Sequence, residues 1–151
     1  QDLPQGAQWD PEELFGTQRR VALGEVTVLA ISYCWLTASH PDPEGAQLRA
    51  LARVLGLFLN SGVADDFAIF LDWCSMYQTE RTEEEEQAFK RSLRHINVWY
   101  AHLQSLVWIL SDSGAAPAYG DRGWPNFECR ISQLIKPDHA VLDLGLLGRA
   151  F

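Results

Sequence analysis

Polar and aromatic side chains stand at the ends of the apolar runs in this chain of 151 residues. They are Ser32, Tyr33 and Trp35 at the first run, Asp72 and Trp73 after the second, and Ser111 and Asp112 after the third. Carboxylates and hydroxyls bind and polarise ligands, and an indole ring supplies a flat wall for one. These residue types are therefore candidates for a binding or catalytic site.

Trp124 and Glu128 form a second candidate group. They are four residues apart, so in a helix both side chains lie on one face. Glu128 is either a catalytic carboxylate or an exposed acid near a helix start, where the helix dipole favours negative charge. Trp124 is either a wall for a ligand or a packing residue. For Tyr33 and Trp35 the alternative is a core position at a strand exit, and for Asp72 it is a brace for the following loop.

The elements that must position these residues follow from the spacing of apolar side chains. Nearly continuous apolar runs predict buried strands over residues 26–33, 67–71, 106–110 and 140–144. Apolar residues at helical spacing predict helices over 46–60, 82–102 and 124–136, and Thr82 with Glu85 forms a capping box at the start of the second. The predicted loops cover 36–45, 73–81 and 113–123.

Strands that alternate with helices predict an α/β fold. We expect a three-layer, flavodoxin-like parallel sheet of four to five strands with helices on both faces. Residues 26–151 are expected to form a single domain, and residues 1–25 an irregular lead-in. The carboxyl ends of parallel strands meet at one edge of a sheet, where ligands bind in such folds. That edge is the expected place of the site.

Charge and composition exclude several classes of function. The formal net charge is −8 and there is no basic patch, which argues against a nucleic-acid partner. No apolar stretch has the length of a membrane span. Glycine-rich phosphate loops and the GxSxG motif are absent. The chain starts at Gln1 rather than Met, and we expect it to be a fragment of a longer protein.

The cysteines and histidines predict neither a metal site nor a disulfide framework. Three cysteines without CxxC spacing and four scattered histidines lack the ligand spacing of a zinc site. Cysteine usage of this kind is typical of a reducing compartment, so we expect a cytoplasmic location.

Three short motifs occur in the order found in a known family. Residues 30–35 read Ala-Ile-Ser-Tyr-Cys-Trp, residues 70–72 read Phe-Leu-Asp with Gln78 further on, and residues 122–128 read Arg-Gly-Trp-Pro-Asn-Phe-Glu. Together they resemble the SYCW, WID…CINQ and Arg-x-Trp-x-x-x-Glu motifs of the fungal heterokaryon-incompatibility (HET) domain. The resemblance spans residues 26–135. HET domains are related to Toll/interleukin-1 receptor (TIR) domains, so the resemblance also implies a TIR-like sheet.

The chain departs from the family pattern in its loops. Residues 36–45 and 112–123 form longer loops than the family pattern has. The loop after Asp72 lacks the usual Gly and Pro, and it carries Trp and Cys where small or apolar residues are usual. Substrate contacts from this loop therefore do not follow from the resemblance alone.

The resemblance implies an NAD+ glycohydrolase that acts in immune or cell-death signalling. In TIR domains that hydrolyse NAD+, the Glu of the Trp-x-x-x-Glu pattern is catalytic. The corresponding residue here is Glu128, with Trp124 beside the substrate. The expected substrate-binding set is completed by Ser32, Tyr33, Trp35, Asp72 and Trp73, with Ser32 and Asp72 on the ribose hydroxyls. No cofactor is expected, because NAD+ is the substrate.

A single carboxylate is enough for this reaction. The bond that breaks joins C1 of ribose to the pyridinium nitrogen of nicotinamide. Because nicotinamide leaves as a neutral molecule, it needs no general acid, whereas ordinary glycosides usually require two carboxylates. One carboxylate can stabilise the oxocarbenium ion that develops on ribose, or trap the sugar covalently.

The same resemblance also supports a second class of function. HET and TIR domains serve as non-catalytic signalling modules that act by self-association. The partners would then be further copies of this chain or other TIR/HET-like domains.

Overall fold

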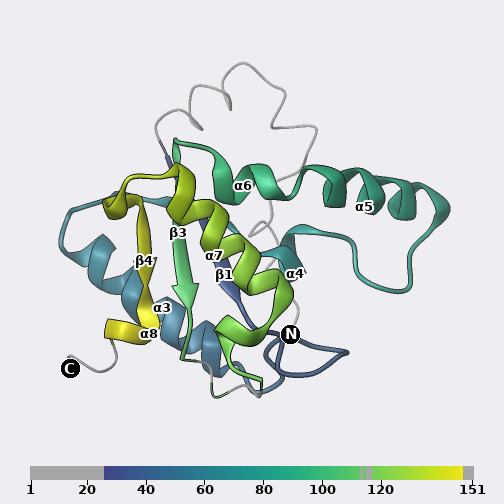
Figure 1. Cartoon of the computed structure of the whole chain (residues 1–151), viewed down its shortest axis with the longest axis horizontal. Coiled ribbons are helices and arrows are strands. Elements are labelled where there is room, and N and C mark those ends of the chain that lie inside the picture. The colour runs from purple at the N-terminus through teal and green to yellow at the C-terminus, as the bar shows by residue number, and fades with distance from the viewer. Residues whose placement is uncertain (1–25, 113, 115–116, 148–151) are drawn as a thin grey trace.

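The fold is built on a sheet of four parallel strands. A computed structural model describes residues 26–112, 114 and 117–147, so the predicted lead-in over 1–25 lies outside the described residues. The strands are β1 (Thr27–Tyr33), β2 (Phe67–Phe70), β3 (Ser105–Leu110) and β4 (Val141–Asp143), arranged in the order β2-β1-β3-β4. Figure 1 labels β1, β3 and β4 of this sheet. The chain therefore steps from β1 to one edge and then crosses back to β3. The prediction of an α/β fold with a flavodoxin-like parallel sheet is confirmed.

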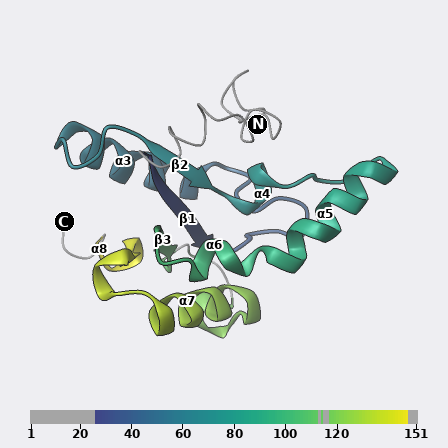
Figure 2. The same ribbon diagram turned by 90° about the horizontal axis from the view of Figure 1, so that it is seen from above.

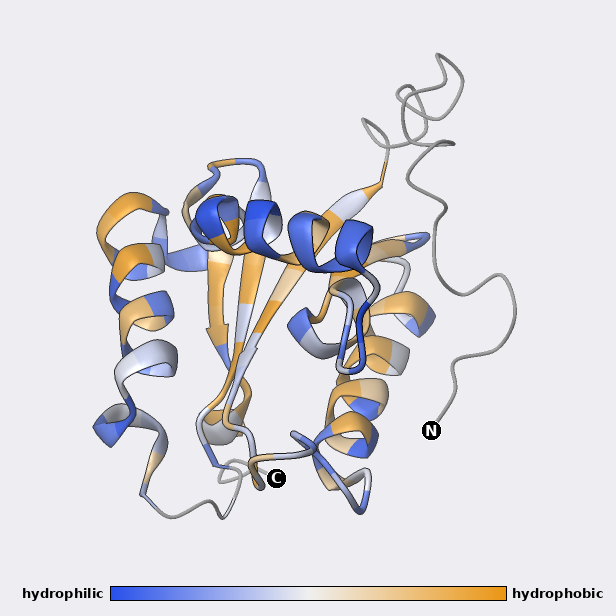
Figure 3. Ribbon diagram, turned by 90° about the vertical axis from the view of Figure 1, so that its right-hand side faces the viewer, coloured by the Kyte–Doolittle hydropathy of each residue, from blue (hydrophilic) through white to orange (hydrophobic). Residues whose placement is uncertain are grey.

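Helices cover both faces of this sheet. The helices α3 (Ala46–Asn60) and α8 (Leu144–Leu147) pack on one face, and α6 (Asn97–Ala101) and α7 (Gly123–Ile135) pack on the other (Figure 2). β1 lies between the two layers and its middle is fully buried. Its near-continuous apolar run thus serves both faces, and the strands stand out as apolar ribbons between the helices in Figure 3.

Alternation along β1 decides which side chain meets which layer. Leu29 and Ile31 pack toward α3, whereas Ala30 packs toward α6 and α7. Successive residues of a strand point to opposite faces, so Ser32 lies on the same face as Ala30. This register places the Ser32 hydroxyl against α7.

The helix predicted over 82–102 is divided in two. α5 (Glu83–His95) begins with the predicted capping box, in which Thr82 and Glu85 each accept a hydrogen bond from the other's backbone N–H. α5 ends before Ile96, whose carbonyl accepts a tighter i→i+3 backbone bond from Trp99 in the first turn of α6. α5 has no buried residues and projects beyond the sheet (Figure 1), whereas α6 packs into the core. The prediction of one continuous helix is wrong because apolar spacing continues across the break.

Two predicted loops contain short helical turns. α4 (Asp72–Ser75) follows β2 directly, and the N–H groups of its last two residues both donate to the Leu71 carbonyl. The segment over 113–123 includes the 3-10 turn η1 (Tyr119–Asp121). The loop predictions are wrong at these turns, because single turns of this kind carry no periodic signal.

The last elements are short and tightly packed. η2 (Asp138–Ala140) leads into β4, and α8 follows β4 at once. A Cβ atom at Gly145 would lie 2.2 Å from the Ser111 Oγ and 2.6 Å from the backbone nitrogen of Asp112, so this position requires glycine. Among the described residues, no helix has both the length and the hydrophobicity needed to cross a bilayer.

Candidate functional site

A cavity of about 540 Å³ opens at the carboxyl ends of β1 and β2. Its walls come from these strand ends, the segment between α4 and α5, the inner face of α5, α6 and the first turns of α7. Five of the seven predicted site residues line it, namely Tyr33, Trp35, Asp72, Trp124 and Glu128. The volume is within the range of small-molecule sites. The structure therefore brings these five residues to one place at the predicted edge.

Glu128 lies in the second turn of α7 and is only 2% exposed. Its Oε2 accepts a hydrogen bond from the Ser32 Oγ at 2.5 Å. Burial raises the pKa of Glu128 from its ordinary 4.5 to about 7. Hydrogen bonding with Ser32, Tyr100 and Trp124 opposes this rise, and the negative charge of Asp72 adds to it. Glu128 therefore changes its charge near neutral pH.

Ser32 links Glu128 to Tyr119. Ser32 is fully buried, and its Oγ lies 2.5 Å from the Tyr119 hydroxyl, which donates to the Pro125 carbonyl at 2.9 Å. Three contacts run in series, from Glu128 to Ser32, from Ser32 to Tyr119 and from Tyr119 to the Pro125 carbonyl. Each contact needs one proton, and the hydroxyls of Ser32 and Tyr119 supply only two. The full set forms when Glu128 is protonated, and one contact must be shared or released when it ionises. The Ser32 hydroxyl donates to the carboxylate, so its own bond favours ionisation, and burial is what raises the pKa of Glu128.

The position of Ser32 corrects one expectation. Ser32 is not among the residues that line the cavity, so it holds the Glu128 carboxylate from behind. The predicted contact with a ribose hydroxyl does not fit this place, because the hydroxyl is sealed beneath the carboxylate.

Asp72 joins the ends of β1 and β2. Its Oδ1 accepts hydrogen bonds from the Tyr33 hydroxyl at 2.5 Å and from the Trp73 N–H at 2.6 Å, and its Oδ2 accepts one from the Trp35 Nε1 at 3.3 Å. Burial raises the pKa of Tyr33 well above its ordinary value, and Asp72 adds to the rise, so Tyr33 is a neutral donor. Asp72 thus braces the strand ends and also lines the cavity.

The three tryptophans of the predicted site differ in whether they line the cavity. Trp73 packs edge-on against Trp35 with 5.1 Å between ring centroids, and His40 covers it at 5.0 Å. Trp73 is not among the lining residues, so it supports the wall rather than forming its surface as predicted. Trp124 lines the cavity and is 46% exposed, which leaves ring surface available to a ligand.

Sequence reasoning misses one wall of the cavity, which we call the α5 wall. It is defined by Arg81, Phe89 and Leu93, with Met76 and Gln78 beside them. The spacing of Phe89 and Leu93 predicts an apolar helix face, but the same spacing serves a face on the core and a face on a cavity. Gln78 belongs to the second motif, and its Nε2 donates to the backbone carbonyls of Trp73 and Met76 at 2.9 Å each.

Three further residues around Glu128 also escape the sequence analysis. The buried Tyr100 lines the cavity, and its hydroxyl donates to the Ile31 carbonyl at 3.3 Å. Arg122, the first residue of the third motif, lines the cavity and donates to the Trp35 carbonyl at 2.8 Å. Tyr119 completes the group through Ser32. Only Arg122 carries a signal in the sequence, because it belongs to a motif.

Comparisons with known proteins supply no relative for this site. No family model matches the chain, and neither does a curated protein or a solved structure. Within the described ranges, no group of three or more His, Cys, Asp or Glu residues is placed to hold a metal ion. The three motifs and the geometry of the cavity are therefore the features that indicate a function.

Proposed function

We propose that this domain is an NAD+ glycohydrolase, which cleaves NAD+ to nicotinamide and ADP-ribose or a cyclic form of it. The observation that carries the proposal is a buried carboxylate, Glu128, in the wall of a cavity that also presents Trp124 and Asp72. The motifs that resemble HET and TIR domains support the same assignment, and with it a role in immune or cell-death signalling. The cysteine usage supports a cytoplasmic location.

The proposed reaction breaks the bond between C1 of ribose and the ring nitrogen of nicotinamide. The electron pair of that bond moves onto the nitrogen and cancels its positive charge, while positive charge develops on ribose. An ionised Glu128 beside C1 stabilises that charge, and its burial makes the interaction stronger than it would be in water. Water then adds to C1 and releases a proton to solvent.

The raised pKa of Glu128 fits this role. At a pKa of about 7, roughly half of Glu128 is ionised at neutral pH before substrate binds. A positive charge nearby favours the ionised form of a carboxyl. The pyridinium ring of NAD+ therefore shifts Glu128 toward the state that the reaction needs.

The other residues have supporting roles in the proposal. Trp124 stacks on a flat ring of the substrate and excludes water from it. Among the described residues, Asp72 Oδ2 accepts only the long contact of 3.3 Å from Trp35, so it is the acceptor for a ribose hydroxyl. Tyr33 and Trp35 hold Asp72 in place for that contact.

The test is to incubate the domain at high concentration with NAD+ and to measure free nicotinamide by chromatography. We expect release by the wild type and a loss of at least about 100-fold in Glu128→Gln, since the developing charge loses its stabilising group. Glu84→Gln is the matched control, because Glu84 is exposed at the start of α5 and should leave the rate unchanged. Circular dichroism checks the fold of each variant. Equal rates in Glu128→Gln and the wild type would remove the proposal, and so would the absence of release at every protein concentration.

Self-association as a non-catalytic module is the second candidate, favoured by one surface feature. Val98 and Trp99 on α6 are 53% and 42% exposed, and they line a hollow of about 250 Å³ with Val28. If copies of the chain meet here, light scattering will show mass that grows with concentration, and Val98→Ser will suppress the growth. A constant monomer mass up to high concentration would contradict this candidate.

A further inference from the structure

The α5 wall places a cation in the same cavity as the two carboxylates. Arg81 lies between α4 and α5 and lines the cavity together with Asp72 and Glu128. Its side chain is only 14% exposed. A cavity with carboxylates on the sheet edge and a guanidinium on another wall suits a ligand that has positive charge at one part and negative charge at another.

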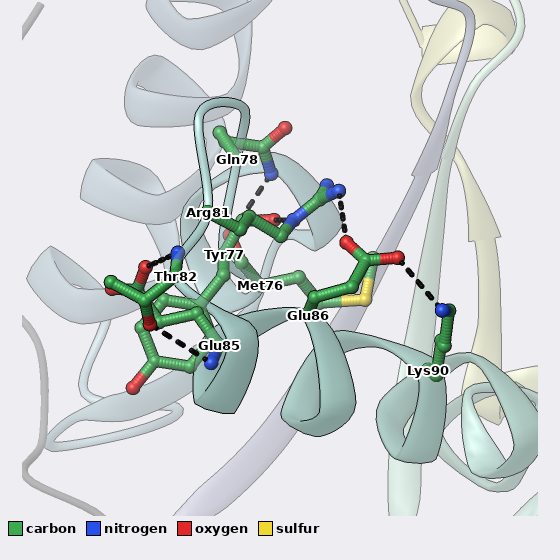
Figure 4. A network of polar contacts seen from close by, with 8 residues as sticks. All are labelled: Met76, Tyr77, Gln78, Arg81, Thr82, Glu85, Glu86 and Lys90. Atoms are coloured by element: carbon green, nitrogen blue, oxygen red, sulfur yellow. Dashed lines mark hydrogen bonds and ion pairs between the residues drawn. The ribbon is translucent and has the colours of Figure 1, made fainter.

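Three contacts hold the Arg81 guanidinium in place. Its Nε donates to the Tyr77 carbonyl at 2.7 Å, its Nη1 donates to Glu86 at 3.1 Å, and its Cζ lies 3.5 Å from the centre of the Phe89 ring. Figure 4 shows the side chain stretched from the 76–81 segment toward α5. The two hydrogen bonds use two of the five N–H donors of a guanidinium, so donors remain for a ligand.

The charges around Arg81 do not cancel. Glu86 accepts from Arg81 at 3.1 Å and from Lys90 at 3.3 Å, so one carboxylate serves two cations (Figure 4). Hydrogen bonds from Lys90 and Arg81 lower the pKa of Glu86, which keeps it ionised at neutral pH. The group of Arg81, Glu86 and Lys90 therefore carries one net positive charge. The exposed Lys90 is not among the lining residues, and Arg81 is the member that reaches the cavity.

We propose that Arg81 anchors the diphosphate of the ligand and makes the site selective for dinucleotides and other nucleoside diphosphates over uncharged nucleosides. A guanidinium binds phosphate oxygens through parallel N–H donors, and a guanidinium that is already stacked and hydrogen-bonded loses little freedom on binding. The inference rests on the proposed function for the other end of the ligand, where the ribosyl-pyridinium meets Glu128. In that arrangement the anion and the cation of NAD+ each face a side chain of opposite charge.

The first experiment compares two substrates that differ in the diphosphate. NAD+ carries it, whereas nicotinamide riboside has the same bond to be cleaved and no phosphate. We expect Arg81→Gln to raise KM for NAD+ at least about 10-fold, with kcat within about 3-fold and with nicotinamide riboside unaffected. Arg91→Gln removes the same charge from an exposed position of α5 outside the cavity, and it should change neither substrate. Equal losses on both substrates would overturn the proposal.

The second experiment separates this proposal from the glycohydrolase itself. ADP-ribose has the diphosphate and lacks nicotinamide, so its binding can be measured by calorimetry without turnover. We expect Kd to rise at least about 10-fold in Arg81→Gln, less in Arg81→Lys, which keeps the charge and loses the fork, and to stay within about 3-fold in Glu128→Gln. Arg81-dependent binding without any nicotinamide release would contradict the proposed glycohydrolase activity and would support Arg81 as the anchor of the diphosphate. Wild type that fails to bind ADP-ribose, or that binds it as tightly as Arg81→Gln does, would overturn the anchor.

Discussion

The two sides of the cavity are built in different ways. On the sheet edge, Glu128 is 2% exposed and is held through Ser32 by residues of β1, η1 and α7. On the α5 wall, Arg81 lies against Phe89 of α5, a helix that has no buried residue, and Leu93 of the same helix is 41% exposed. The first side is part of the core and the second projects from it.

This difference separates chemistry from recognition. A group that stabilises a transition state must be fixed before the substrate arrives, and packing on all sides fixes it. A wall that only binds the remote part of a ligand can tolerate local opening, and elements with few buried contacts open at lower free energy than the core. The proposed roles of Glu128 and Arg81 follow this division.

The largest effect should appear in the free energy of unfolding. Ile31 is fully buried at the centre of β1, so Ile31→Ala should cost about 2–5 kcal/mol. Leu93→Ala on α5 should cost less than about 1 kcal/mol, because Leu93 is already largely exposed. Urea denaturation measures both. Similar losses in the two variants would show that α5 belongs to the cooperative core. They would contradict the difference between the two sides of the cavity.

Ionisation of Glu128 should lower the free energy of unfolding as pH rises. Its pKa in the fold is about 7 against an ordinary 4.5, so the folded state binds more protons than the unfolded state between these values. Wild-type stability therefore falls between about pH 4.5 and 7, by about 3 kcal/mol at most from this group. Glu128→Gln should lack this fall and become more stable than the wild type above pH 7.

The measurement is urea denaturation of both proteins at pH 5, 6, 7 and 8. The difference between them isolates Glu128 from other titrating groups. A difference that does not change with pH would mean that burial does not raise the pKa of this carboxyl. Ionised Glu128 at the sheet edge would then not be destabilised by its burial.

Ser32→Ala should lower the rate of nicotinamide release at neutral pH. The Ser32 hydroxyl donates to ionised Glu128, so its loss raises the pKa of Glu128 further. Nicotinamide release depends on the ionised form, so the rise of the rate with pH should move upward by about one pH unit, with about 5-fold less activity at pH 7. Ser61→Ala, which removes an exposed hydroxyl at the end of α3, is the control. An unmoved pH profile would assign Ser32 to packing alone.

The two sides also differ in how much the sequence predicts. Tyr33, Asp72 and Glu128 follow from strand ends and motif spacing, because both are local patterns along the chain. The face that Ser32 takes also follows from strand alternation, once Glu128 is known to lie on the covering helix. Tyr119 and Arg81 lie in segments without periodicity, and only the folded chain brings them to Ser32 and Phe89. Arg81 on the α5 wall and Tyr119 behind Ser32 are therefore the parts of the site that needed the structure.

The smallest effect should come from the cap of α5. Thr82→Ala removes one half of the capping box and should cost about 1 kcal/mol of helix stability. Hydrogen exchange in α5 should then quicken, and KM for NAD+ should rise a few-fold, because the wall that carries Arg81 opens more often. Ser92→Ala, within the same helix, should leave both unchanged, because its hydroxyl only bonds back to the Ala88 carbonyl.

The pH profile of the rate should not move in Thr82→Ala, since Glu128 has no bond to α5 among the described contacts. A shift of that profile in Thr82→Ala would show that the two sides of the cavity are coupled, and that a loosened wall also changes the charge of the carboxylate.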